Sequence, residues 1–122
     1  MATLSIDDAP TKARRADLRR ALDAIAGRWK LEILWLLSQH KHRFGQLRRG
    51  LPGITQHMLT VQLRKLEADG LVKRTAYAEV PPRVVYEIMP AARQLRPIFQ
   101  AILKWAAENP PPQKRGRGKT AE

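Results

Sequence analysis

The stretch from Thr55 to Ile88 decides the fold. It reads Thr55-Gln-His-Met-Leu-Thr-Val-Gln-Leu-Arg-Lys-Leu-Glu-Ala-Asp-Gly70, then Leu71-Val-Lys-Arg-Thr-Ala-Tyr77, a loop Ala78-Glu-Val-Pro-Pro82, and Arg83-Val-Val-Tyr-Glu-Ile88. Threonine is a good helix N-cap and glycine a good residue just past a helix, so the first run predicts a helix over 56–69. The two later runs are typical of strands, and the Pro-rich loop is too long for a two-residue turn. They predict a β-hairpin with an extended loop.

Helical patterns surround this stretch on both sides. Apolar spacing predicts helices over 16–26, 29–39, 44–49 and 90–107, and Leu51-Pro-Gly53 predicts a turn. The helix over 29–39 is apolar almost all round, which is typical of a central helix packed on several sides. A helix-turn-helix followed by a hairpin is the winged-helix arrangement. The predicted fold is therefore mainly α with a small β-hairpin (α+β), with extra N- and C-terminal helices.

The helix over 56–69 has one apolar and one cationic face. At about 100° per residue, its buried stripe consists of Leu59, Gln62, Leu63 and Leu66. No acid occurs before the last turn, so the N-terminal half presents donors and the positive end of the helix dipole. Glutamine pairs with adenine, arginine with guanine or phosphate, and valine with a thymine methyl. A solvated amphipathic helix is the alternative, but the basic hairpin that follows favours contact with DNA.

The hairpin carries Lys73, Arg74 and Arg83. Pro81-Pro82 stiffens the loop just before Arg83, which presents its guanidinium at lower entropic cost. The alternative role of Arg83 is a strand-end arginine bonded to a carbonyl of its own loop. The complete set of candidate DNA-binding residues is Thr55, Gln56, His57, Thr60, Val61, Arg64, Lys65, Arg43, Arg74 and Arg83.

Length and charge agree with a small nucleic-acid-binding protein. The chain has 122 residues, enough for one domain, and a formal net charge of +12. Residues 21–108 alone carry +7, so most of the excess lies on the part that folds. A basic folded surface indicates a polyanionic partner, although positive charge also simply keeps small proteins dissolved. The absence of cysteine excludes disulfides, thiolate metal sites and thiol redox switches.

The ends of the chain differ from its middle. We expect a flexible N-terminal arm over 1–13, a DNA-binding domain with dimerisation helices over 14–108, and a disordered basic tail over 109–122. No secretory signal or membrane-length apolar run is visible, so we expect a cytoplasmic protein without a membrane partner. No catalytic set emerges, and no cofactor is predicted. His40 and His42 lack partners at metal-ligating spacing, so surface imidazoles are favoured over a metal site.

The last helix is more apolar than one packed stripe requires, which predicts a homodimer. The candidate interface residues are Leu18, Leu22, Ile25, Leu95, Ile98, Phe99, Ile102 and Trp105. Packing of both terminal helices on their own chain is the alternative. A pocket for a small-molecule effector, lined by Trp29, Trp35 and Trp105, is a further hypothesis, although such aromatics more often belong to a plain core.

Several segments together resemble the HxlR-type family of bacterial winged-helix transcriptional regulators. They include Ala21-Leu-Asp-Ala-Ile-Ala-Gly-Arg-Trp-Lys30 and Leu51-Pro-Gly-Ile-Thr55, and the match spans roughly 17–107. The most specific segments are Leu66-Glu-Ala-Asp-Gly-Leu71 and Glu79-Val-Pro-Pro-Arg-Val84. The resemblance implies a homodimer on a two-fold-related operator, acting as repressor or activator, with DNA contacts from Thr55, Thr60, Arg64 and Arg83. The chain departs from the family in having no sensing cysteine, and in reading Ile88-Met-Pro-Ala-Ala92 where relatives have Leu-Thr-x-x-Gly.

The leading hypothesis is thus a dimeric, sequence-specific DNA-binding transcriptional regulator. The helix over 55–69 would enter the major groove, and the loop over 77–84 would lie on the flanking backbone or minor groove. A non-specific, architectural nucleic-acid-binding protein is the second hypothesis. The third is a protein–protein adaptor that has kept the fold and lost DNA binding.

Overall fold

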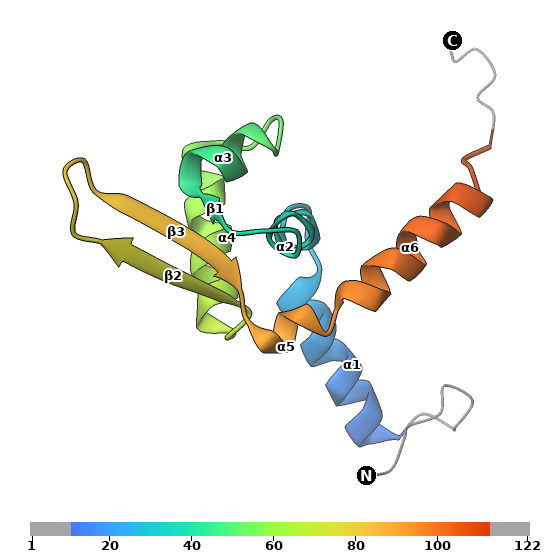
Figure 1. Ribbon diagram of the computed structural model, residues 1–122. Helices are drawn as coiled ribbons and strands as arrows, with labels where there is room; N and C mark the ends of the chain where they lie inside the picture. Colours follow the sequence, from blue (N-terminus) through green and yellow to red (C-terminus); the bar gives the residue numbers. More distant parts are fainter. Residues whose placement is uncertain (1–10, 113–122) are drawn as a thin grey trace.

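The computed structural model describes residues 11–112, which form six helices and a three-stranded sheet (Figure 1). In chain order the elements are α1 (Lys12–Ile25), α2 (Lys30–Leu37), β1 (His42–Arg43), α3 (Phe44–Arg49), α4 (Gln56–Ala68), β2 (Val72–Tyr77), β3 (Arg83–Ile88), α5 (Pro90–Arg93) and α6 (Arg96–Glu108). This α+β order confirms the predicted winged helix. In Figure 1 the β2–β3 hairpin projects from one side of the molecule, and α1 and α6 extend from the other.

The core lies where α2, α3, α4 and the root of the hairpin meet. Ile33 and Leu34 of α2, Leu47 of α3 and Leu59 of α4 are fully buried there. The predicted stripe of α4 is confirmed for its leucines, whereas Gln62 is half-buried. Helix α2 is packed on several sides, as predicted, since Ile33, Leu34 and Leu37 are buried. Trp35 remains 42% exposed on the side that faces α6.

Both ends of α4 are fixed by local hydrogen bonds. At the start, Thr55 Oγ1 accepts from the Met58 N–H at 3.0 Å. At the end, the Gly70 N–H donates to the Glu67 carbonyl at 3.0 Å and the Leu71 N–H donates to the Leu66 carbonyl at 2.9 Å. This is the Schellman pattern, and it requires the left-handed φ of +74° that Gly70 adopts. The helix therefore has a defined length and direction.

The sheet has the order β1-β3-β2 and is antiparallel throughout. At the root of the hairpin Val72 pairs with Ile88 and both are buried, whereas at the tip Tyr77 pairs with Arg83. The loop between these strands is exposed, and Val80 is fully so. The hairpin is thus anchored in the core at one end and projects into solvent at the other, as a wing does. The two-residue strand β1 was not predicted.

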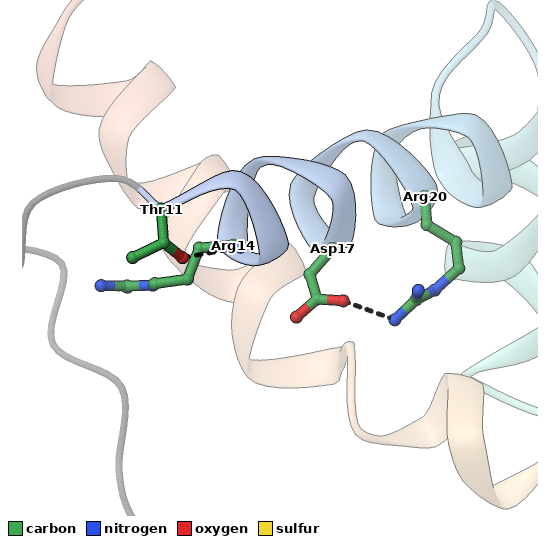
Figure 2. A network of polar contacts seen from close by, with 4 residues as sticks. All are labelled: Thr11, Arg14, Asp17 and Arg20. Atoms are coloured by element: carbon green, nitrogen blue, oxygen red, sulfur yellow. Dashed lines mark hydrogen bonds and ion pairs between the residues drawn. The ribbon is translucent and has the colours of Figure 1, made fainter.

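Helix α1 begins earlier than the sequence pattern predicts. Thr11 Oγ1 accepts from the Arg14 N–H at 3.1 Å and caps the helix, so Lys12 and Ala13 are helical (Figure 2). The predicted boundary of a flexible arm at residue 13 is corrected accordingly; residues 1–10 lie outside the described part. Farther along α1, the Arg20 guanidinium pairs with Asp17 at 2.8 Å. The basic tail predicted over 109–122 lies outside the described residues from position 113 onward.

Lys30 connects α1 to the body of the domain. Its side chain is 9% exposed, and its Nζ donates to the carbonyl of Asp23 at 2.9 Å. Asp23 lies in the last turn of α1, where backbone carbonyls lack helical partners and attract a cation. The ammonium group therefore ties the C-terminal end of α1 to the N-terminal end of α2.

The single helix predicted over 90–107 is wrong. The structure has a short α5, a turn at Gln94 and Leu95, and then α6. Pro97 explains the break, because it has no N–H to donate to the preceding turn and is tolerated only at the start of a helix. The break allows α6 to leave the body in a new direction, and in Figure 1 α6 and α1 diverge from each other.

Candidate DNA interface

A groove of about 500 Å³ runs between α4 and the sheet. Its lining combines apolar side chains at the base with polar and charged side chains from α4 and β2. The lining residues are Phe44, Gln56, Thr60, Leu63, Arg64, Glu67, Arg74, Val84 and Tyr86. We call this the reading groove. Four of the predicted DNA-binding residues, Gln56, Thr60, Arg64 and Arg74, meet in it.

The N-terminal end of α4 is the electropositive part of this surface. Its first turn holds Gln56 and His57 and no acid, and both side chains are exposed. Thr55 accepts one hydrogen bond from the Met58 N–H and keeps its own hydroxyl proton. That proton, the remaining N–H groups of the first turn and the helix dipole all favour an anion at this end.

Thr60 presents a different chemistry. Its Oγ1 donates to the Gln56 carbonyl at 2.8 Å. Because a hydroxyl has one proton, Thr60 offers the groove only acceptor lone pairs and its methyl group. Arg64, one turn farther on, is exposed and supplies donors. The groove therefore presents acceptors and donors side by side, as recognition of base edges requires.

The remaining predicted residues of α4 lie outside the reading groove. His57 and Lys65 are exposed and Val61 is half-buried. They occupy the adjoining face of the same helix, so α4 presents a continuous, acid-free surface until Glu67. Arg43 lies at the start of α3 and is exposed, and its backbone N–H donates to Gln46 Oε1 at 2.8 Å.

Arg83 is held at the tip of the wing by its own loop. Its Nε donates to Glu79 Oε1 at 3.3 Å, and an NH2 donates to Glu79 Oε2 at 2.9 Å. The guanidinium carbon also lies 3.9 Å from the centre of the Tyr77 ring. We call these three residues the wing clasp. A partner in its own loop was the alternative expected for Arg83, but the partner is a carboxylate rather than a carbonyl.

The clasp moves the pKa values of its two charged members, Glu79 and Arg83, further from neutrality. The hydrogen bond from Arg83 holds the pKa of Glu79 below its ordinary value; desolvation opposes this, and the charges of Arg83 and Arg43 reinforce it. The same hydrogen bond raises the pKa of Arg83. Glu79 is thus an anion and Arg83 a cation at any pH near neutrality.

The sequence reasoning missed Glu79 and Tyr77 as members of the interface. Both signals were present. Glu79 stands four residues before Arg83, close enough for the opposite charges to meet across a tight loop. Tyr77 is the last residue of β2, and it is opposite Arg83 in the β2–β3 ladder.

The histidines of the β1 region do not form a metal centre. The rings of His40 and His42 stack with their centres 4.2 Å apart. Their Nδ1 atoms face the carbonyls of Lys41 and His40 at 2.7 and 2.8 Å, so each Nδ1 carries a proton. Among residues 11–112 no group of three potential metal ligands gathers. In the same part of the chain, no helix has the length and apolar character needed to cross a bilayer.

The predicted dimer residues fall into two groups. Leu18 and Leu22 on α1, and Ile98, Ile102 and Trp105 on α6, are 46–64% exposed. Leu103 of α6, absent from the predicted set, is exposed as well. Phe99 is corrected. It is 6% exposed and belongs to the core of its own chain, and Ile25 and Leu95 pack against that core.

The three tryptophans do not line one pocket. Trp29 lies in the core, with the Arg28 guanidinium 4.5 Å above its ring. Trp35 lines an open apolar hollow of about 340 Å³ between α2 and α6, whereas Trp105 lies exposed farther along α6. The predicted effector pocket is therefore not formed as described.

Comparison with known proteins gives a consistent result. A family model for HxlR-like helix-turn-helix proteins matches residues 24–114. The chain is 46% identical over 88 residues to the uncharacterized HTH-type transcriptional regulator YybR of Bacillus subtilis, covering 72% of this chain and 70% of YybR. It is 42% identical over 98 residues to YtcD of the same species, covering 80% of this chain and 78% of YtcD.

Solved structures agree with this result. The redox regulator HypR in its oxidized form superimposes with a TM-score of 0.73 at 42% identity, covering 78% of this chain and 98% of HypR. The crystal structure of YtcD gives a TM-score of 0.72 at 44% identity, covering 75% and 93%. The present sequence contains no cysteine. From the matched segment, the identities and the winged-helix architecture, we conclude that the chain belongs to the HxlR-like helix-turn-helix family, whose members here are named as transcriptional regulators rather than enzymes.

Proposed function

We propose that this protein is a homodimeric, sequence-specific DNA-binding transcriptional regulator. In this proposal α4 enters the major groove, and the loop between β2 and β3 lies on the flanking backbone or minor groove. Family membership supports the general function. The assignment of individual residues rests on the geometry of the surface.

The observation that carries the proposal is the reading groove and its continuity with the N-terminal end of α4. The reading groove is open to solvent and is lined by Gln56, Thr60, Arg64 and Arg74. Its two arginines outnumber its one acid, Glu67, so its net charge is positive. Thr55 and the first turn of α4 suit a phosphate, and the groove residues suit base edges. Groups suited to the DNA backbone and groups suited to base edges thus lie on the same surface.

The exposed apolar faces of α1 and α6 support the dimer. Six large apolar side chains of these helices remain 46–64% exposed, and soluble monomers rarely leave large apolar surfaces in water. Two copies related by a two-fold axis would bring their α4 helices to major grooves about 34–36 Å apart, or a multiple of that distance. The operator is then expected to be a two-fold-related sequence.

A mobility-shift experiment tests the function. The DNA upstream of the protein's own gene is compared with a scrambled fragment of the same length and composition. A regulator of this kind is expected to bind its operator about 10³–10⁷ times more tightly than other DNA. Equal affinity for the two fragments would contradict the proposal and favour an architectural protein. Absence of binding to both would favour an adaptor.

The substitution Arg64→Ala tests the assignment of the groove. If Arg64 reads a base, its loss costs about 1–3 kcal/mol of binding to the operator and relaxes the preference at one base pair. The matched control is Arg93→Ala, which removes an exposed arginine of α5 that lies outside the reading groove. Equal losses for the two variants would show that Arg64 acts only through its charge.

A further inference from the structure

We propose that Glu79 is a positioning residue of the DNA interface: its carboxylate orients the Arg83 guanidinium on Tyr77 and cancels the charge of the wing tip, which limits attraction to DNA of any sequence. The inference rests on the proposed function, because it concerns how the wing meets DNA. It assigns a role to an acidic residue in a surface that is otherwise basic.

The geometry of the wing clasp supports the positioning role. Two separate hydrogen bonds, from Nε and from an NH2 of Arg83, reach the two oxygens of one carboxylate. A paired contact of this kind fixes the plane of the guanidinium, and the Tyr77 ring 3.9 Å away supports that plane from one side. Register adds a further constraint, since Tyr77 and Arg83 are opposite each other in the β2–β3 ladder.

The clasp leaves Arg83 able to bind phosphate. A guanidinium has five N–H donors, and the contacts with Glu79 use two of them. The other three N–H groups remain directed away from the carboxylate. Arg83 can therefore donate to a phosphate oxygen while it is still paired with Glu79. This contact depends on the orientation of the guanidinium N–H groups rather than on an unpaired positive charge.

The charge pattern supports the second half of the proposal. Between residues 72 and 83 the wing carries Lys73, Arg74 and Arg83, and Glu79 is the one acid. The clasp is neutral as a unit, so the tip adds no net charge for a distant phosphate to attract. Non-specific binding to DNA depends on the number of phosphates neutralised by cations. A neutral wing tip therefore adds little affinity for DNA whose sequence does not match the reading groove.

The substitution Glu79→Gln tests this inference in the full-length protein. Glutamine keeps one acceptor for Arg83 but removes the negative charge, which leaves a net positive tip. On a random-sequence 30-base-pair duplex, the slope of log affinity against log salt is expected to become steeper by about 0.9 per wing. Affinity for that duplex is expected to rise roughly five- to tenfold per wing at about 0.1 M salt. The preference for operator over random DNA is expected to fall by the same order.

Two control variants separate charge from other effects. Glu79→Asp keeps the charge, so its salt slope is expected to match the wild type. Glu108→Gln removes an exposed acid that also stands four residues from a basic partner, Lys104, but lies at the end of α6. Its slope is expected to stay unchanged, since the added charge is remote from the wing. Melting temperatures without DNA establish that each variant is folded.

The outcomes distinguish this inference from the proposed function. If the wild type binds DNA and Glu79→Gln leaves the slope unchanged, the inference is wrong and the proposed function stands. If Glu79→Gln weakens binding without steepening the slope, Glu79 only stabilises the wing and the inference is again wrong. If the wild type fails to bind both operator and random DNA, the proposed function falls, and the inference with it.

Discussion

Thr55 and Thr60 lie one turn apart and use their hydroxyl groups in opposite ways. Thr55 accepts from a backbone N–H and retains its proton, whereas Thr60 gives its proton to the Gln56 carbonyl. A phosphate oxygen only accepts hydrogen bonds, so Thr55 suits the DNA backbone. Thr60 can receive a hydrogen bond from a base amino group or place its methyl against a thymine. The same residue type thus serves two parts of one interface.

The cap at Thr55 makes a measurable contribution to stability. Replacement by alanine leaves the Met58 N–H without its side-chain acceptor. We expect Thr55→Ala to lower the free energy of unfolding by about 0.5–2 kcal/mol, measured by urea denaturation. Thr55→Ser retains the acceptor and is the matched control, expected to stay near the wild type. Equal losses in both variants would mean that packing of the threonine methyl, rather than the cap, stabilises the helix.

Single residues were predictable where a local pattern determines their environment. The leucine stripe of α4 follows from helical spacing, and the cap follows from the preference of threonine for that position. The pairing of Arg83 with Glu79 was not predicted, because it depends on how the five-residue loop folds back on itself. A sequence gives the separation of two charges along the chain but not the path between them.

At the scale of elements, the end of α4 determines where the wing begins. The Schellman pattern stops the helix at Asp69 and turns the chain through Gly70 directly into β2. The hydrogen bond from Leu71 to Leu66 spans more residues than the one from Gly70 to Glu67. Leu66 is buried and Leu71 is half-buried. A change in this turn would alter the angle between the reading helix and the wing.

Gly70→Ala tests the turn. At a φ of +74° a Cβ is unfavourable, so we expect the free energy of unfolding to fall by about 1–2 kcal/mol. Gly45→Ala is the matched control. Gly45 lies inside α3, where an added Cβ meets the end of the Arg49 side chain at 3.4 Å. Alanine is favoured over glycine within a helix, so this variant is expected to gain about 0.5–1 kcal/mol. A stable Gly70→Ala protein would contradict the assigned role of the turn.

The elements that were mispredicted have separate physical causes. Strand β1 has two residues and exists through its pairing with β3, so no local pattern indicates it. The break before α6 was marked by Pro97, but the strong apolar spacing on both sides of it suggested one continuous helix. For Trp35 the sequence left a plain core position or the lining of an effector pocket open. Its exposure results from the direction that α6 takes after the break.

At the scale of the whole molecule, the candidate DNA surface and the exposed apolar side chains lie on opposite sides. The wing and α4 form the first side, and α1 and α6 extend from the opposite side (Figure 1). The positions of Leu18, Leu22, Ile98, Ile102 and Trp105 on the apolar side were predicted from their spacing and are exposed as expected, but the dimer itself stays a prediction.

Ile102→Gln tests the apolar side as a dimer interface. Ile102 is 49% exposed and lies at the edge of the hollow beside Trp35. Burying an isoleucine stabilises by about 1.5–3 kcal/mol, and a two-fold interface contains the residue twice. We therefore expect Ile102→Gln to shift the protein from dimer towards monomer in sedimentation experiments. Val80→Gln, at an exposed loop position, is the control and should remain dimeric. A wild-type protein that sediments as a monomer would contradict the dimer.

The bond from Lys30 to the Asp23 carbonyl has a mechanical consequence for such a dimer. If α1 joins the two subunits, this ammonium group connects the joint to the helix on which the reading unit is built. Tilting α1 would leave a nearly buried cation without its acceptor, which is unfavourable. In such a dimer this contact would resist changes in the distance between the two α4 helices, and hence in the spacing between the two half-sites.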